Sequence, residues 1–298
     1  MGLLTEHIHH HELSLKGSQS SLARVDLAGL SDKGRVRTNN EDHYLIARGD
    51  RQLTVLSTNL PAKDFAEASS ETAYGLLVAD GIGGTTGGGI ASRMAVSLFI
   101  DLVIHTPDWI MRPENDPFPE VLRRMEERFL EIRNALIDKA STDQSLRSMG
   151  TTLTLACSLG RDLIISHVGD SRAYLFSEGE LQRLTRDQTY VQTLVDAGTI
   201  TPEQAAAHPM RHVLTDAIST AKSAPEVELL HLRIDDGDRL LLCSDGLTEM
   251  VSDSVIAGVL AGPESAEENC RTLVDLALQA GGVDNVTVAI ARYGFPSA

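Results

Sequence analysis

Short runs of apolar residues predict that much of the chain forms β-strands. Within residues 151–158, Leu153 and Leu155 alternate with threonine and alanine, and this period of two is typical of a strand with one buried face. The segment 285–291 alternates in the same way. Other short β-rich runs, bounded by Gly, Asp or Asn, predict strands at residues 53–57, 73–79, 163–168, 173–176 and 238–244.

A second pattern, with apolar residues three and four positions apart, predicts helices. It is clearest over residues 118–137 and recurs at 88–104 and about 264–280. The strands gather in pairs and triplets instead of alternating singly with helices, which favours antiparallel meanders over a doubly wound parallel sheet. The chain is therefore expected to be an α+β protein, with a polar loop at 58–72 and a connection between two helices at 106–117.

Composition narrows the class of protein. The 298 residues include 26 Lys and Arg against 42 Asp and Glu, a net charge of −16, and 42% are hydrophobic. A chain of this length can bury a core of its own. The net charge repels phosphate backbones and anionic lipid, and no dense basic block offsets it. Neither nucleic acid nor a membrane surface is therefore an expected partner.

The sequence carries no sign of a membrane span or an export signal. It has no stretch of about 18 uninterrupted apolar residues, so a membrane-spanning helix is not expected. The N-terminus lacks the basic start and apolar run of a secretory signal. The cysteines, Cys157, Cys243 and Cys270, share no metal-ligand spacing, which favours free thiols in a reducing, cytoplasmic compartment.

Residues 1–22 are polar and are expected to form a disordered N-terminal tail. Two interpretations apply to the tail's histidines, which could bind a metal ion or belong to a solvated leader. No helical or strand period holds them together, which favours the solvated leader. Residues 23–298 are expected to form a single domain. The histidines concerned are His7, His9, His10 and His11.

Four aspartates stand where surface charge is not expected. Asp80, Asp170 and Asp245 each follow an apolar run and adjoin a glycine, and Asp284 precedes the last predicted strand. Strand ends from distant parts of the chain can meet at one edge of a sheet, where unpaired carboxylates would repel one another. A hard divalent cation relieves that repulsion, and magnesium or manganese suits an all-oxygen ligand set better than zinc. The alternative is that each Asp-Gly pair is only a turn.

The block 31–46 adds a cation to this acidic set. Arg37 lies four residues before Glu41 and five before Asp42, and its fork of donors suits a phosphoryl group held beside metal ions. An exposed turn is the other interpretation of this block. The glycine-rich segment 80–89 carries no nucleotide-binding signature. Its glycines would let the backbone pass close to metal ions, with the Gly81 carbonyl as a ligand.

In their order and spacing, these motifs resemble the metal-dependent protein serine/threonine phosphatases of the PPM, or type-2C, family in its bacterial form. The resemblance extends over about 25–293. It implies an αββα sandwich, in which two antiparallel β-sheets pack face to face and helices flank them, with a flap at about 185–222. The matching blocks include SDKGRVRTNNED (31–42), LLVADGIGG (76–84), MGTTLTLA (149–156), HVGDSRAYLF (167–176), LLLCSDGLTEMV (240–251) and GGVDNVTVAI (281–290).

The resemblance also implies a metal centre. Two divalent cations, manganese or magnesium, would be bridged by Asp80, with the Gly81 carbonyl beside it. Asp245 and Asp284 would hold the outer positions. Asp170 matches the residue that helps to hold a weaker third ion in bacterial relatives.

Four matching residues would serve the substrate and the ligands. Arg37 would grip the phosphate, Glu41 and Asp42 would act on the ions directly or through bound water, and Asn285 would orient Asp284 or a ligand water. The implied reaction is hydrolysis of phosphoserine or phosphothreonine in proteins by a water activated between two ions, without a phosphoenzyme. Phosphoproteins made by a Ser/Thr kinase would be the substrates.

Two departures from the family pattern bear on rate and substrate choice. Ile82 stands where eukaryotic members carry a histidine proposed as general acid, and Gln188 replaces a histidine common in the flap. The alternative function is a catalytically weak pseudophosphatase that binds phosphoproteins. It predicts a degraded metal site, which the sequence does not show. A two-metal nuclease is disfavoured by the charge of −16.

Overall fold

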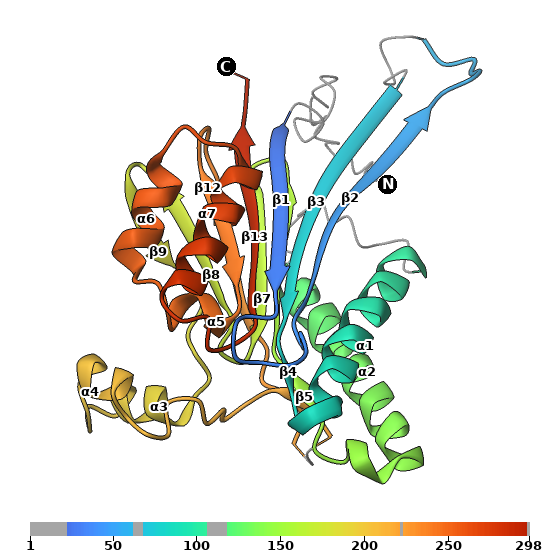
Figure 1. Cartoon of the computed structure of the whole chain (residues 1–298). Helices are drawn as coiled ribbons and strands as arrows, with labels where there is room; N and C mark the ends of the chain where they lie inside the picture. Colours follow the sequence, from blue (N-terminus) through green and yellow to red (C-terminus); the bar gives the residue numbers. More distant parts are fainter. Residues whose placement is uncertain (1–22, 62–67, 106–117, 221–222, 297–298) are drawn as a thin grey trace, which may run out of the picture.

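The structure, a computed structural model, describes residues 23–61, 68–105, 118–220 and 223–296. The expectations for the N-terminal tail at 1–22 and for the helix connection at 106–117 lie outside these residues. The described chain is a stack of helix, sheet, sheet and helix layers (Figure 1). The αββα sandwich expected from the sequence is therefore confirmed.

Within the described residues, ten strands form two antiparallel five-stranded sheets, here named sheet A and sheet B. A small third sheet joins β10 (Ile218–Ser219), β5 (Gly150–Thr151) and β4 (Gly81–Ile82). The strand order in sheet A is β1 (Arg24–Asp32), β13 (Val286–Gly294), β12 (Arg239–Cys243), β8 (Arg172–Ser177) and β9 (Glu180–Arg183). The order in sheet B is β11 (Glu228–Arg233), β7 (Asp162–Val168), β6 (Leu153–Leu159), β3 (Ala68–Ala79) and β2 (His43–Thr54).

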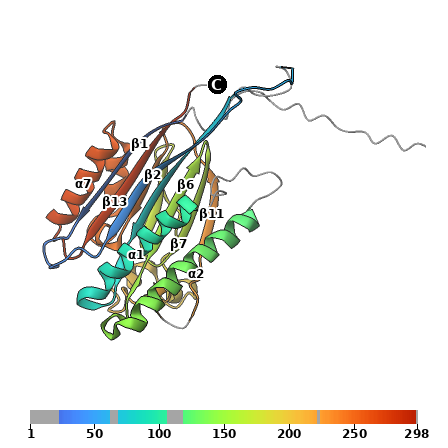
Figure 2. The same cartoon turned by 90° about the vertical axis from the view of Figure 1, so that its right-hand side faces the viewer.

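Helices cover the outer face of each sheet. The long helices α1 (Gly84–His105) and α2 (Phe118–Thr142) lie side by side across sheet B (Figure 2). Sheet A is covered by α5 (Asp245–Thr248), α6 (Asp253–Ala261) and α7 (Ala266–Gln279). The short helices α3 (Tyr190–Asp196) and α4 (Pro202–Ala206) extend beyond the lower end of the sandwich in Figure 1, within the segment expected to be the flap. A 3₁₀ turn, η3 (Gln144–Leu146), follows α2.

Alternation along the central strands divides the core into layers. In β3, Leu76 and Val78 face sheet A, whereas Leu77 and Ala79 face α1 and α2. The same division holds in β12, which packs on sheet B with one side and on α7 with the other. Because these strands are buried on both faces, they appear in the sequence as continuous apolar runs, which is why they could be predicted.

The predictions were less accurate at the sheet edges. The prediction of a strand at 53–57 was wrong beyond Thr54, where β2 ends, and the loop predicted at 58–72 was wrong from Ala68, where β3 begins. The polar residues of this part of β3 pair with β2, and the Thr72 hydroxyl donates to Asp50 Oδ1 at 2.8 Å. Backbone pairing in a long hairpin therefore overrides the polar character of the segment. The strands β1 and β11, which were not predicted, are also edge strands with one neighbour each.

The three predicted helices are confirmed as α1, α2 and α7, with shifted ends. One stretch in the described residues, Gly87–Ile104 of α1, is long and apolar enough to span a membrane, with a mean hydropathy of 1.5. In this structure, Ala91, Ala95 and Phe99 of that stretch pack into the core between α1 and sheet B. About 33% of the stretch is buried in this way.

We expect a substitution between the sheets to destabilise the protein far more than one on its surface. Leu242 is fully buried between the sheets, so Leu242→Ala should lower the free energy of unfolding by about 2–5 kcal/mol. Leu56 is 93% exposed, and Leu56→Ala is the control, with an expected change below about 0.5 kcal/mol. Urea unfolding followed by circular dichroism measures both variants. Equal losses would contradict this assignment of the layers.

Candidate metal centre and active site

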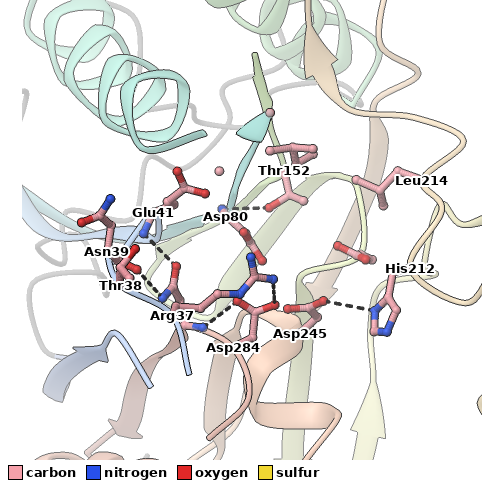
Figure 3. A pocket seen from close by; sticks show the side chains of 15 residues that line it. Arg37, Thr38, Asn39, Glu41, Asp80, Thr152, His212, Leu214, Asp245 and Asp284 are labelled. Carbon is pink, nitrogen blue, oxygen red and sulfur yellow. Dashed lines mark hydrogen bonds and ion pairs between the residues drawn. The ribbon is translucent and has the colours of Figure 1, made fainter. Parts of the chain in front are cut away.

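Four aspartates converge at the end of the sandwich from which the flap segment extends. They line a cleft of about 550 Å³ together with Arg37 and Glu41 (Figure 3). The convergence expected from the sequence is therefore present, and the role of these groups as metal ligands stays a prediction. Each aspartate adjoins a strand end: Asp80 lies between β3 and β4, Asp170 after β7, Asp245 after β12 and Asp284 before β13.

Glycines let the chain approach itself closely around this cleft. A β-carbon on Gly81 would lie 2.3 Å from the backbone of Gly88 in α1 and 2.8 Å from the carbonyl oxygen of Glu41. Gly169, directly before Asp170, has a φ of 112°, which other residues rarely adopt. The backbone of Gly81 itself lines the cleft, as the predicted use of its carbonyl requires.

Two threonines hold the backbone of Asp80. The Asp80 N–H donates to Thr152 Oγ1 at 3.0 Å (Figure 3). The Asp80 carbonyl accepts from the Thr151 hydroxyl at 2.8 Å and from the Thr152 N–H at 2.9 Å. The main chain is thereby fixed while the carboxylate faces the cleft. Sequence reasoning gave neither threonine a role, although the adjacent pair in the block MGTTLTLA, at the start of a buried strand, was a signal.

Asp42 is buried instead of lining the cleft. Its side chain is 4% exposed, and its Oδ2 accepts from the Ser244 hydroxyl at 2.7 Å. Its Oδ1 has no hydrogen-bond partner among the described residues. Burial raises the pKa of Asp42 to about 7, and the charge of Asp245 adds to the rise. The sequence suggested that Asp42 acts on the ions directly or through water. Asp42 does not line the cleft, and its charge acts on Asp80; its action on the ions stays a prediction.

Asn285 joins the loop 33–41 to the start of β13. Its Oδ1 accepts from the Glu41 N–H at 2.8 Å, and its Nδ2 donates to two carbonyls of the same loop, also at 2.8 Å. Its backbone N–H donates to Asp284 Oδ1 at 2.8 Å. The contact expected between Asn285 and Asp284 is thus made by the main chain. The side chain has a second task, fixing the loop, which the sequence did not reveal.

Arg37 lies among the carboxylates. Its Nη2 donates to Asp284 Oδ2 at 2.6 Å (Figure 3). The pKa of Arg37 is raised by this hydrogen bond and by the charges of Asp284, Asp80 and Asp245. The side chain is 54% exposed, so its remaining donors can reach a group that enters the cleft.

His212 is a cleft residue that sequence reasoning missed. It comes from the flap segment, and its Nδ1 lies 3.4 Å from Glu249 Oε1. The same nitrogen lies 3.9 Å from Asp245 Oδ2 (Figure 3). The pKa of His212 is raised by the nearby carboxylates of Asp245 and Glu249. The sequence indicated no histidine beside the aspartates, and the structure corrects this. The folding of the flap over the cleft leaves no local pattern that would have shown the contact.

Comparison with known proteins identifies the family. The sequence profile of protein phosphatase 2C matches residues 51–269. The protein phosphatase PhpP of Streptococcus pneumoniae is 34% identical over 268 residues, which cover 89% of this chain and 96% of PhpP. The chain belongs to the protein phosphatase 2C family. The resemblance seen in the sequence motifs is therefore confirmed.

Other members of the protein phosphatase 2C family share the fold. The serine/threonine protein phosphatase PstP of Mycobacterium tuberculosis is 37% identical over 274 residues, covering 91% of this chain. The chain spans 46%, about half, of the length of PstP. A crystal structure of M. tuberculosis PstP has a TM-score of 0.71 at 35% identity, over 90% of this chain and 98% of that one. The catalytic domain of PstP in complex with two manganese ions has a TM-score of 0.70 at 34% identity, over 91% and 99%.

The acidic cleft of this protein phosphatase 2C member fits hard divalent cations. Burial raises the pKa of Asp80 well above its usual range, and the charges of Asp42 and Asp245 raise it further. Burial and the charge of Asp245 likewise raise the pKa of Asp170. The unpaired Oδ1 of buried Asp42 adds to this excess of acceptors. A cation with oxygen ligands would relieve the repulsion, whereas a thiol- or imidazole-seeking metal finds few suitable donors here.

We expect cation binding at this cleft to release protons. Because burial and neighbouring charges raise the pKa values of Asp42, Asp80 and Asp170, these groups hold protons more tightly than free carboxylates do, and a bound cation competes with those protons. The affinity for Mn²⁺ should therefore increase by about tenfold or more between about pH 5.5 and about pH 7.5. Titration calorimetry in buffers of different ionisation heat measures both affinity and proton release. An affinity independent of pH, with no proton release, would contradict the carboxylate assignment.

Proposed function

We propose that this protein is a metal-dependent protein serine/threonine phosphatase that hydrolyses phosphoserine and phosphothreonine in proteins. The observation that carries the proposal is the convergence of four aspartates and Arg37 in one cleft. Membership of the protein phosphatase 2C family, with relatives named as serine/threonine phosphatases, supports it. The substrate would enter the cleft as the phosphorylated side chain of a protein segment lying along the flap.

The proposed cations would be held by oxygen atoms of Asp80, Gly81, Asp245 and Asp284, with Asp170 assigned to a weaker third ion. Divalent cations bound there would supply an activated water and would neutralise charge on the phosphoryl oxygens. Manganese and magnesium both suit this donor set. The two manganese ions of the PstP catalytic domain support manganese as the first ion to test.

The chain's own residues would bind and orient the phosphoryl group. Arg37, with donors to spare beyond its contact to Asp284, would bind the phosphoryl oxygens and stabilise the negative charge that they carry during transfer. Glu41, whose backbone is fixed by Asn285, would hold water at the metal side of the cleft. None of these steps requires a covalent phosphoenzyme. The cysteines cannot supply a nucleophile here, because burial raises the pKa of the Cys243 and Cys270 thiols and Cys157 lies outside the cleft.

The proposed partners follow from charge and from the reaction. The substrates would be phosphoproteins made by a Ser/Thr kinase. The net charge of −16 argues against nucleic acid and anionic membranes as partners. All three cysteines are free thiols, which supports a reducing, cytoplasmic compartment.

A pseudophosphatase that only binds phosphoproteins is the alternative proposal. It would be favoured by the loss of an aspartate or of Arg37 from the cleft. The residues lining the cleft retain all of them, and backbone hydrogen bonds hold Asp80 in position. An active enzyme is therefore the better-supported function.

Asp245→Asn should abolish most of the activity. The substitution keeps the shape of the side chain and removes one ligand charge, so phosphate release from a phosphothreonine peptide in Mn²⁺ should fall by about a hundredfold or more. EDTA should have the same effect on the wild type. Asp275→Asn is the control, since Asp275 is an exposed residue of α7 and the change in charge is the same. If Asp245→Asn turns over like the wild type, the metal assignment is refuted, and if folded wild type is inactive in any divalent metal, the pseudophosphatase is favoured.

Arg37→Ala should separate phosphate binding from metal binding. Losing a charged hydrogen bond to the phosphoryl group should lower kcat/KM by about 10- to 100-fold. The affinity for Mn²⁺ should not weaken, because the substitution removes a cation that competes for Asp284. Steady-state kinetics and calorimetry on the same preparation measure the two effects. A loss of Mn²⁺ affinity with unchanged kinetics at saturating metal would contradict the proposed role of Arg37.

A further inference from the structure

A second cavity, of about 420 Å³, lies between sheet B and the two helices that cover it. We call it the helix-side cavity. It shares no lining residue with the metal cleft. The helix α1 begins at the cleft and reaches the cavity with Phe99, Val103 and Ile104, so the two sites are roughly 20 Å apart along the helix at 1.5 Å per residue. Figure 2 shows the face of sheet B on which α1 and α2 lie.

Small residues at one level of sheet B create the floor of the cavity. Ala47 of β2 pairs with Gly75 of β3, and Gly75 pairs with Cys157 of β6, so three adjacent strands present small side chains in register. The next level toward the metal cleft carries large residues instead, Leu77 paired with Leu155, and is filled. The strand register of sheet B therefore creates the hollow, because it places small residues of three strands side by side.

An arginine without a partner lines this mostly apolar hollow. Arg128 of α2 is only 7% exposed, yet it forms no hydrogen bond or ion pair with any described residue. Its burial lowers the pKa of its guanidinium, which nevertheless stays charged. A buried charge without a counter-ion is strongly unfavourable. An anion bound beside the Arg128 guanidinium would compensate this charge.

The surrounding side chains do not provide that anion. Burial raises the pKa of the Cys157 thiol to about 11, so it is neutral. The carboxylate of Asp50 at the rim accepts from Arg48 at 3.0 Å and from Thr72 at 2.8 Å. Glu131 lies on the same helix and influences Arg128 only through its charge. Among the described residues no side chain supplies the counter-ion, which points to a bound molecule.

We propose that the helix-side cavity binds a small amphiphilic carboxylate, with its headgroup on Arg128 and its apolar body over the floor formed by Ala47, Gly75 and Cys157. The charged lining residues other than Arg128 are Arg48 and Asp50, which pair with each other. Mostly apolar walls around one charge that is left over, in a volume of this size, are typical of small-molecule sites. A single guanidinium matches a single carboxylate in two parallel hydrogen bonds. A phosphate dianion would leave one charge uncompensated among apolar walls, so the carboxylate is favoured.

Octanoate and octanol are the probes, because they differ only in the headgroup. Titration calorimetry with the full chain should show octanoate binding at least tenfold more tightly than octanol. Arg128→Met keeps the apolar length and removes the charge, so it should abolish this tenfold preference. Arg123→Met is the matched control, because Arg123 lies on the same helix, is exposed and pairs with Glu127, and it should leave the preference unchanged.

A second variant fills the cavity without touching the charge. A β-carbon on Gly75 meets only the carbonyl oxygen of Ala156 at 4.0 Å, so the leucine side chain of Gly75→Leu can enter the hollow. This variant should lose the binding of both probes.

Arg128→Met should also raise the melting temperature of the ligand-free protein, because it removes an unpaired buried charge.

Three binding results would overturn the proposal. These are no octanoate binding to the wild type, equal binding of octanoate and octanol, or a preference that survives Arg128→Met. A fall in melting temperature in Arg128→Met would show that Arg128 already has a structural partner, and would also overturn it. The wild type and Gly75→Leu decide the question even if Arg128→Met is unstable. Because the assays need no phosphopeptide, their outcome is independent of the proposed phosphatase activity.

Discussion

Repulsion among carboxylates at one end of the sandwich is the constraint on which the rest of the site depends. Asp42 is buried beside half-buried Asp80, and the charges of Asp245, Asp170 and Asp284 act on Asp80 as well. Such a cluster would push its members apart if the backbone were free to move. The surrounding hydrogen bonds oppose that movement, because the threonines of the MGTTLTLA block fix Asp80 and Asn285 fixes the neighbouring loop. The same repulsion gives the cleft its affinity for cations.

The two-sheet core makes this arrangement rigid. The aspartates follow or precede the strands β3, β7, β12 and β13, which are buried and hydrogen-bonded to neighbours on both sides. Groups that are far apart in the sequence are thereby held at one end of a packed layer. Arg37 comes from the loop 33–41, and the hydrogen bonds of the Asn285 side chain hold this loop in place. Rigid strands supply the acidic groups, while the loop and the flap supply the residues that would meet the substrate.

The strands that could be predicted from the sequence are those that are buried on both faces. The central strands β3 and β12 could be predicted because both faces are buried, whereas the edge strands β1 and β11 were missed because one neighbour imposes only a weak pattern. Asp80, Asp170 and Asp245 could be found from their glycine neighbours, and Asp284 could be found from the predicted strand that follows it. His212 could not, since its contact with Asp245 depends on how the flap folds back. Arg128 lies in a helix that was predicted from its apolar pattern. Its position over a hollow could not be predicted, because the hollow depends on small residues of the strands β2, β3 and β6.

The central claim is that the acidic cleft is a centre for divalent cations. Crystals grown with Mn²⁺ and measured at a wavelength where manganese scatters anomalously would test it most directly. Two strong peaks are expected in the cleft, with Asp80 in contact with both and Asp245 and Asp284 in contact with one or the other. Crystals saturated with Mn²⁺ that show no peak in the cleft would contradict the account.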